Sequence, residues 1–132
     1  MKFNIIGTGN IACFFVDRLV KAGCECVGVY GRNKNNAQEL AIAAKCKTIE
    51  NLSDIKDNAD CCIIAVSDNA ISEIAEQLHL ENTVLIHTAG SIQRNVLDIA
   101  APHNATIWPV YSVNKADIPQ HRDIPIVVEI SD

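Results

Sequence analysis

The sequence lacks a long apolar run, a cluster of basic residues and any internal repeat. No apolar stretch approaches the roughly 18 residues that cross a membrane, so no membrane segment is expected. The net charge is −5, from 11 basic and 16 acidic residues. This charge and the lack of a basic cluster both argue against a nucleic-acid partner. The apolar start, residues 1–6, meets glycine at once and is too short for a signal peptide. We therefore expect a cytoplasmic protein.

The six cysteines lack the spacing of a metal site. None stands in a C-x-x-C arrangement, and a zinc site would need paired spacings of that kind. Most of them fall inside predicted strands or helices, next to apolar residues. We expect small buried side chains in a reducing compartment, and no metal. The cysteines are Cys13, Cys24, Cys26, Cys46, Cys61 and Cys62.

The sequence does contain enough apolar residues to fill one core. Its 132 residues fit one domain, and 48% of them are hydrophobic, too many for a disordered chain. Short apolar runs alternate with stretches in which apolar residues recur at helical spacing. Strands are predicted at residues 2–6, 26–30, 61–66, 83–87, 105–110 and 126–130, with a short one possible at 46–48. Helices are predicted at residues 10–22, 35–44 and about 71–78, with a weaker pattern at 93–100.

This alternation predicts an α/β fold, a doubly wound parallel Rossmann sheet with helices on both faces, in a single domain. The expected strand order is 3-2-1-4-5-6. The unbroken apolar run at 61–66 fits a parallel strand buried on both faces. Residues 50–60 are polar and predict a loop, with a turn of helix at 52–55. Asp68 or Asn69 is expected to cap the helix that follows.

Residues 7–12 read Gly-Thr-Gly-Asn-Ile-Ala, which is the G-x-G-x-x-A pattern of a dinucleotide-binding turn. Gly7 permits a tight turn, Gly9 lets a pyrophosphate approach the backbone, and Ala12 lets the helix pack close to the strand. The amides of the turn and the helix dipole would meet the phosphates. The pattern is weak alone, but a strand, a long helix and a second strand surround it as required. The alternative is a tight turn without a ligand.

The residues after the second strand distinguish NADP from NAD. NAD-specific domains usually place a carboxylate there, and this chain has none between Val27 and Gln38. Arg32, helped by Lys34, could instead pair with a 2′-phosphate, because guanidinium suits that bidentate contact. NADP (NADPH) is therefore the expected cofactor, and NAD is the less favoured one. The alternative is that Arg32 and Lys34 belong to a solvated loop.

Two further segments follow predicted strands and should face the cofactor, because ligands lie beyond the carboxyl ends of such strands. Residues 65–68 would contact the diphosphate or the nicotinamide ribose, although Ser67 and Asp68 could equally cap the next helix. Small residues at 88–91 would leave room for the nicotinamide ring. The predicted cofactor-binding residues are Gly7, Thr8, Gly9, Asn10, Ile11, Ala12, Tyr30, Gly31, Arg32, Lys34, Ala65, Val66, Ser67, Asp68, Thr88, Ala89 and Gly90.

No catalytic residue is assigned from the sequence. Hydride transfer needs a proton donor near the nicotinamide, and His87 ends a predicted strand in that region. His87 could instead bond the backbone of the turn that follows it. Tyr111 and Ser112 follow a late strand and could approach a substrate. The other histidines, which fall in predicted surface segments, are His79, His103 and His121.

With these segments in hand, the chain resembles the Rossmann-like NADP oxidoreductases of the DUF2520 type. That group is related to pyrroline-5-carboxylate reductase and to F420-dependent NADP oxidoreductases. The resemblance covers nearly the whole chain. It departs at Trp108–Ser112, where the group usually has a Pro-Leu-Gln-Thr-Phe-like segment and only Pro109 matches. The matching segments are Ile6–Ala12, Val29–Arg32, Ala59–Asp60, Ile63–Ile71 and His87–Ser91.

The resemblance implies an NADP-binding domain followed by a helical domain that completes the active site and often a homodimer. Residues 1–132 are then expected to be the binding domain alone, with little or no turnover. An excised domain is favoured over a natural stand-alone module. The predicted function of the whole protein is hydride transfer between NADPH and a small imine or carbonyl substrate. The alternatives are a non-catalytic dinucleotide sensor or scaffold, and a methyltransferase, which would want an acidic residue after the second strand.

Overall fold

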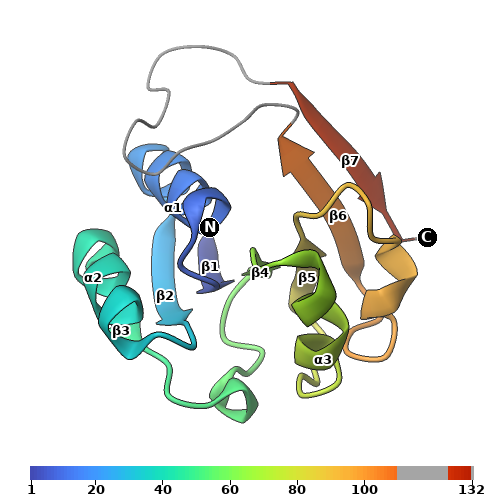
Figure 1. The fold of residues 1–132 in the computed structure, drawn as a ribbon, viewed down its shortest axis with the longest axis horizontal. Coiled ribbons are helices and arrows are strands. Elements are labelled where there is room, and N and C mark those ends of the chain that lie inside the picture. Colours follow the sequence, from blue (N-terminus) through green and yellow to red (C-terminus); the bar gives the residue numbers. More distant parts are fainter. Residues whose placement is uncertain (110–124, 132) are drawn as a thin grey trace.

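The structure is a computed structural model, and it describes residues 1–109 and 125–131. Strands and helices alternate through most of this region, as predicted (Figure 1). The α-helices are α1 (Asn10–Lys21), α2 (Lys34–Ala44) and α3 (Ile71–Ala75), and the short 3-10 helices are η1 (Leu52–Asp54), η2 (Asp68–Ala70) and η3 (Arg94–Leu97). The strands are β1 (Lys2–Ile6), β2 (Glu25–Tyr30), β3 (Lys47–Thr48), β4 (Cys61–Ile64), β5 (Val84–His87), β6 (Asn104–Pro109) and β7 (Ile126–Ile130).

Within the described residues, the strands form one sheet in the order β3-β2-β1-β4-β5-β6-β7. The strands from β3 to β6 pair in parallel, which confirms the Rossmann order expected from the sequence. β7 pairs with β6 in the antiparallel direction, so the expectation of a wholly parallel sheet is wrong at this edge. An antiparallel edge strand on a parallel sheet is common, since it needs no crossover helix.

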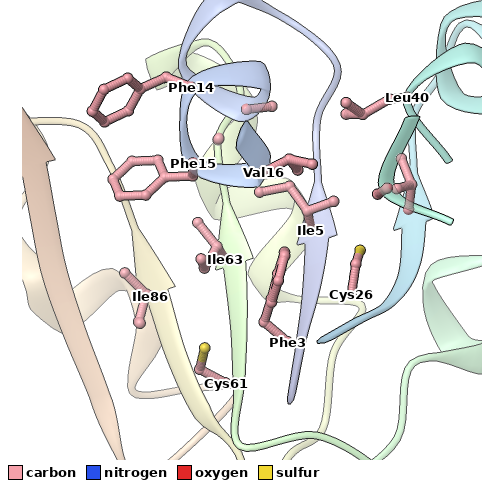
Figure 2. Close-up of a cluster of buried hydrophobic side chains, with 14 of the residues drawn as sticks. Phe3, Ile5, Phe14, Phe15, Val16, Cys26, Leu40, Cys61, Ile63 and Ile86 are labelled. Atoms are coloured by element: carbon pink, nitrogen blue, oxygen red, sulfur yellow. The ribbon is translucent and has the colours of Figure 1, made fainter. Parts of the chain in front are cut away.

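Two apolar clusters cover the two faces of the sheet, because neighbouring side chains on a strand point to opposite faces. One cluster joins Phe3 and Ile5 of β1 to Phe14 and Phe15 of α1 and to α2 (Figure 2). The other contains Ile6 and packs under α3, η1 and η3. Helices therefore lie on both faces, as predicted. Because β1, β2, β4 and β5 pair in parallel, their carboxyl ends lie next to one another at the same end of the sheet.

The first two helices match their predicted ranges, and the later ones are shorter. Residues 71–78 form only the five-residue α3 after η2, and residues 93–100 form only η3. Short helical runs make few i→i−4 hydrogen bonds to offset the cost of nucleation, and such segments often take 3-10 geometry. The predicted cap at Asp68 or Asn69 is also wrong, because no side chain caps η2 or α3.

Three further observations concern the membrane, metal and cysteine predictions. No helix in the described ranges is long and apolar enough to cross a membrane. Across the same residues, no group of three or more histidine, cysteine, aspartate or glutamate side chains is placed to hold a metal ion. All six cysteines lie in the described part of the chain, where they are buried or half-buried and form no disulfide.

Candidate functional site

A cleft of about 630 Å³ lies at the carboxyl ends of the central strands. Five chain segments line it: the turn after β1, the end of β2, η1, the stretch from the turn after β4 to the residues just after α3, and the start of the turn after β5. All the predicted cofactor-binding residues line this cleft except Ala12, Lys34, Ala89 and Gly90. The sheet topology therefore brings together residues that are distant in sequence, as the Rossmann interpretation requires.

The turn from β1 into α1 depends on glycine at position 7. Gly7 has a φ of +119°, and a Cβ placed there would lie 2.0 Å from the carbonyl oxygen of Ala65. Its amide donates to the carbonyl of Tyr30 at 2.8 Å, while the amide of Ala65 donates to the carbonyl of Ile6 at 2.8 Å. These bonds hold the ends of β1, β2 and β4 together, so the floor of the cleft is fixed by backbone contacts.

Gly9 leaves the start of α1 open toward the cleft. It is the N-cap of the helix, no side chain caps the first turn, and no acidic residue stands in that turn. A Cβ on Gly9 would meet no atom of the described residues within 4 Å. Ala12 is fully buried and brings α1 close to the sheet, which is the role the motif predicted for it. A helix N-terminus next to a residue without a side chain has the geometry of an anion-binding site.

The end of β2 presents one cationic side chain to the cleft. Arg32 and Asn33 are exposed and line it, and the Asn33 side chain caps α2 by accepting from the amide of Asn36 at 3.0 Å. Lys34 points elsewhere: its ammonium lies 3.1 Å from the Glu50 carboxylate and 3.2 Å from the Glu50 carbonyl. The predicted pair of cations is therefore reduced to Arg32.

Two side-chain hydrogen bonds tie the turn after β5 to the turn after β4. The hydroxyl of Thr88 donates to the carbonyl of Ile64 at 3.3 Å, and the hydroxyl of Ser91 donates to the Asp68 carboxylate at 2.5 Å. The Asp68 carboxylate thus contacts the neighbouring turn, and no side chain caps η2 or α3 after it. Together the two bonds fix the width of the cleft between these segments.

His87 supports the turn after β5 from beneath. The ring is fully buried, and its Nδ1 accepts a hydrogen bond from the amide of Ala89 at 3.2 Å. Its Nε2 lies 3.3 Å from the Gln93 carbonyl and 3.2 Å from the Thr106 hydroxyl. Burial lowers the pKa of His87, so the neutral ring is favoured. The geometry matches the backbone-bonding alternative, because His87 does not line the cleft.

The small residues at positions 89 and 90 pack against protein atoms. Ala89 belongs to the core cluster under α3. A Cβ on Gly90 would lie 2.7 Å from the indole of Trp108, so glycine is needed there for contact with that ring. The space expected for a nicotinamide ring above Gly90 is therefore bounded by Trp108. Val110, Tyr111, Ser112 and His121 lie outside the described residues.

Several lining residues were not identified from the sequence. Ala70, Glu73, Ile74 and Gln77 stand at the spacing i, i+3, i+4 and i+7, which places them on one side of a helical segment. The sequence predicted a helix at about residues 71–78, but nothing in it indicated that this side faces a cleft. The full set missed is Ile6, Asn33, Leu52, Ala70, Glu73, Ile74 and Gln77.

Comparison with known proteins adds a family to this geometry. A protein-family profile described as shikimate / quinate 5-dehydrogenase matches residues 1–121, which include every residue that lines the cleft. The chain belongs to the shikimate / quinate 5-dehydrogenase family. The family profile does not confirm the DUF2520-type resemblance, so membership of that group stays a prediction. A search of curated proteins found no match to this member of the family.

Solved structures share the fold of this family member. BF3122 from Bacteroides fragilis, provisionally named an NADP oxidoreductase, is 30% identical with a TM-score of 0.88, over 99% of this chain and 52% of that one. Protein TM1727 from Thermotoga maritima is 22% identical with a TM-score of 0.76, over 98% of this chain and 49% of that one. The 1-pyrroline-5-carboxylate reductase of Streptococcus pyogenes is 21% identical with a TM-score of 0.69, over 83% of this chain and 42% of that one. The chain thus spans about half the length of these proteins.

Proposed function

We propose that this chain is the NADP-binding half of an oxidoreductase that moves hydride between NADPH and a small imine or carbonyl substrate. The observation that carries the proposal is the open N-terminus of α1 at Gly9, which faces a cleft of about 630 Å³ with Arg32 on its rim. An anion site and a separate cation in one cleft suit a ligand with a diphosphate and a 2′-phosphate.

The residues of the cleft divide the cofactor between them. The amides that begin α1 bind the diphosphate, and the missing side chain of Gly9 lets those phosphates approach the backbone. Arg32 binds the 2′-phosphate. The apolar side chains of Leu52 and Ile74 line the same cleft and offer surfaces for the adenine ring.

The bound nicotinamide would supply the hydride, and the chain would orient it. Thr88, held by its bond to the Ile64 carbonyl, limits where the ring can lie between the turns after β4 and β5. The imine or carbonyl substrate, the DUF2520-type assignment, a homodimer and a cytoplasmic location all belong to this proposal. The likeness to a reductase whose named substrate contains a C=N bond supports the imine, and the 30% identity to BF3122 supports NADP.

Titration of the purified chain with NADPH and with NADH tests the cofactor. We expect NADPH to bind more tightly, and Arg32→Ala to weaken NADPH by about 1.5–3 kcal/mol, the usual contribution of a hydrogen bond to a charged group. NADH binding should hardly change in that variant, because NADH has no 2′-phosphate. Tighter or equal binding of NADH by the unsubstituted chain would contradict the assignment.

Lys34→Ala is the matched control for Arg32→Ala. The Lys34 ammonium is bonded to Glu50 and does not line the cleft, so its removal should leave NADPH affinity within about threefold. If Lys34→Ala weakens NADPH as much as Arg32→Ala does, the assignment of the 2′-phosphate to Arg32 is wrong. A general charge effect would explain that result better.

A further inference from the structure

Two cysteine sulfurs lie side by side on the α1–α2 face of the sheet. The Sγ atoms of Cys26 and Cys46 are 3.4 Å apart, although 20 residues separate them in sequence. Cys26 is a buried residue of β2 within the cluster shown in Figure 2. Cys46 is half-buried in the turn between α2 and β3, and packs against the same cluster. Cys46 is therefore the more exposed residue of the pair.

Backbone structure holds the two sulfurs together. Lys45 ends α2 in a left-handed conformation with a φ of 57°, and the amide of Cys46 donates to the carbonyl of Ala41 at 2.9 Å. The next residue, Lys47, pairs with Gly28 in the parallel ladder between β3 and β2. The helix end and the strand pairing fix Cys46 against β2, so the sulfur contact does not depend on a loose loop.

The environments of the two thiols differ in the way a reactive pair requires. Hydrogen bonding with Cys26 lowers the pKa of the Cys46 thiol, while the same contact and burial raise the pKa of Cys26. Cys46 is thus the sulfur that ionises first and meets a reagent first. The neighbouring residues Cys61 and Cys62 provide a contrast, since they point into opposite core clusters and cannot face each other.

We propose that Cys26 and Cys46 are a dithiol site that a low-molecular-weight disulfide, such as oxidised glutathione, converts into a disulfide. The Cys46 thiolate attacks one sulfur of the reagent, forms a mixed disulfide and releases one thiolate. The Cys26 thiol loses its proton and attacks the Cys46 sulfur, which breaks the mixed disulfide and releases the second thiol. The protein loses two protons and two electrons, and the reagent takes them up and is reduced to two thiols.

The new bond would fasten the end of α2 to β2. These are the elements whose other ends carry Asn33 and Tyr30, which line the cleft. The site itself does not touch the cleft. It is independent of the proposed cofactor, and its test needs no cofactor.

Peptide mapping under non-reducing conditions tests the proposal on the unmodified chain. After incubation with oxidised glutathione and digestion with trypsin, we expect the two-residue peptide Cys46–Lys47 to be linked to the peptide that spans residues 22–32. The linked mass should equal the sum of the two peptides minus two hydrogen atoms, and dithiothreitol should abolish it. Because that longer peptide also contains Cys24, Cys24→Ser is the matched control and should leave the link unchanged.

Cys26→Ser should stop the reaction at the mixed disulfide of Cys46 with glutathione, and Cys46→Ser should prevent both products. Circular dichroism of each variant confirms that it folds. The proposal is overturned if the unmodified chain keeps a stable mixed disulfide on Cys46, if the link runs to Cys24, or if Cys26 and Cys46 stay reduced while other cysteines react.

Discussion

At the scale of single residues, Asp57 organises the chain before β5. Its two carboxylate oxygens accept hydrogen bonds from the amides of Glu81, Asn82 and Thr83 at 3.0, 3.1 and 2.9 Å. These bonds favour the ionised form and lower the pKa of Asp57 from its ordinary value of 3.8 to about 2. The Thr83 hydroxyl adds a bond to the carbonyl of Ala59 at 2.9 Å. Asp57 therefore fixes where β5 begins.

The lowered pKa of Asp57 predicts a pH dependence of stability. A carboxyl whose folded-state pKa lies below its unfolded value stabilises the fold fully above the unfolded pKa, and loses that contribution as pH falls through the folded pKa. The window for Asp57 runs from about pH 4 down to about pH 2. We expect Asp57→Ala to unfold more easily at pH 7, and the difference from the unsubstituted chain to shrink across that window. Urea denaturation at each pH measures it.

The control for Asp57→Ala is Glu39→Gln, which removes an exposed carboxylate from α2, away from this loop. It should give a difference from the unsubstituted chain that is small at every pH. Asp57→Asn keeps one oxygen acceptor and should fall between the two. A difference for Asp57→Ala that stays constant from pH 7 to pH 2 would contradict the role of the charge.

At the scale of elements, the turn between β1 and α1 contains two glycines, Gly7 and Gly9, whose substitution should separate an effect on folding from an effect on binding. Gly7→Ala forces a side chain into the carbonyl of Ala65 at a φ of +119°, so we expect a loss of roughly 3 kcal/mol or more. In Gly9→Ala the new methyl group meets no atom of residues 1–109 or 125–131, and the φ of −84° suits any residue. We expect that variant to keep its stability within about 1 kcal/mol and to bind NADPH at least tenfold more weakly. Thermal unfolding and cofactor titration measure the two effects.

Gly9→Ala is itself the control for Gly7→Ala, since both add one methyl group to the same turn. Unchanged NADPH binding by a folded Gly9→Ala variant would show that phosphates do not approach this residue. Unchanged stability of Gly7→Ala would contradict the clash at Ala65. The two results are separate, because one reports on the ligand and the other on the fold.

The elements that the sequence predicted well have strong local patterns. β4 reads as an unbroken apolar run because both faces are buried, and α2 buries Ala37, Leu40, Ala41 and Ala44, the residues that its spacing indicated. The α3 region was overestimated, because Leu78 is buried although the α-helix ends at Ala75. A residue at helical spacing can be buried even where the helix does not continue to it. The direction of β7 has no local signal, since strand residues look alike in either orientation.

The candidate site was predictable where it depends on backbone geometry, and less so where side chains choose partners. Gly7 is needed for the tight turn that the motif predicts, and the role of Gly9 in admitting phosphates stays a prediction. Lys34 was expected beside Arg32, but Glu50 follows a later strand and its position opposite Lys34 arises only in the folded chain. Trp108 reaches Gly90 from β6 for the same reason. Contacts between segments that are distant in sequence cannot be predicted from the spacing of residues along the chain.

At the scale of the whole molecule, the cleft contains the groups assigned to cofactor binding, but His87 does not donate a proton into it. His87 is the histidine at the end of a central strand, and it is buried with both ring nitrogens engaged. Its lowered pKa keeps it neutral near pH 7. His87 is therefore not the acid that would protonate a substrate in the cleft. The relatives are about twice as long as this chain, so they contain a second half that could supply one.

We accordingly expect the 132-residue chain to bind NADPH but to oxidise it no faster than buffer does when small imines or ketones are added. Hydride transfer needs both the positioned ring and a proton donor, and the buried His87 does not supply that donor. Loss of absorbance at the NADPH band, followed with and without the chain, measures turnover, and cofactor titration in the same buffer confirms binding. His87→Gln is the sharpest check, because a catalytic His87 would make any observed rate depend on it. Measurable turnover that falls at least tenfold in a folded His87→Gln variant would contradict the supporting role assigned to this buried ring. Binding without turnover in a longer protein that includes the second half would instead favour a dinucleotide sensor over a reductase.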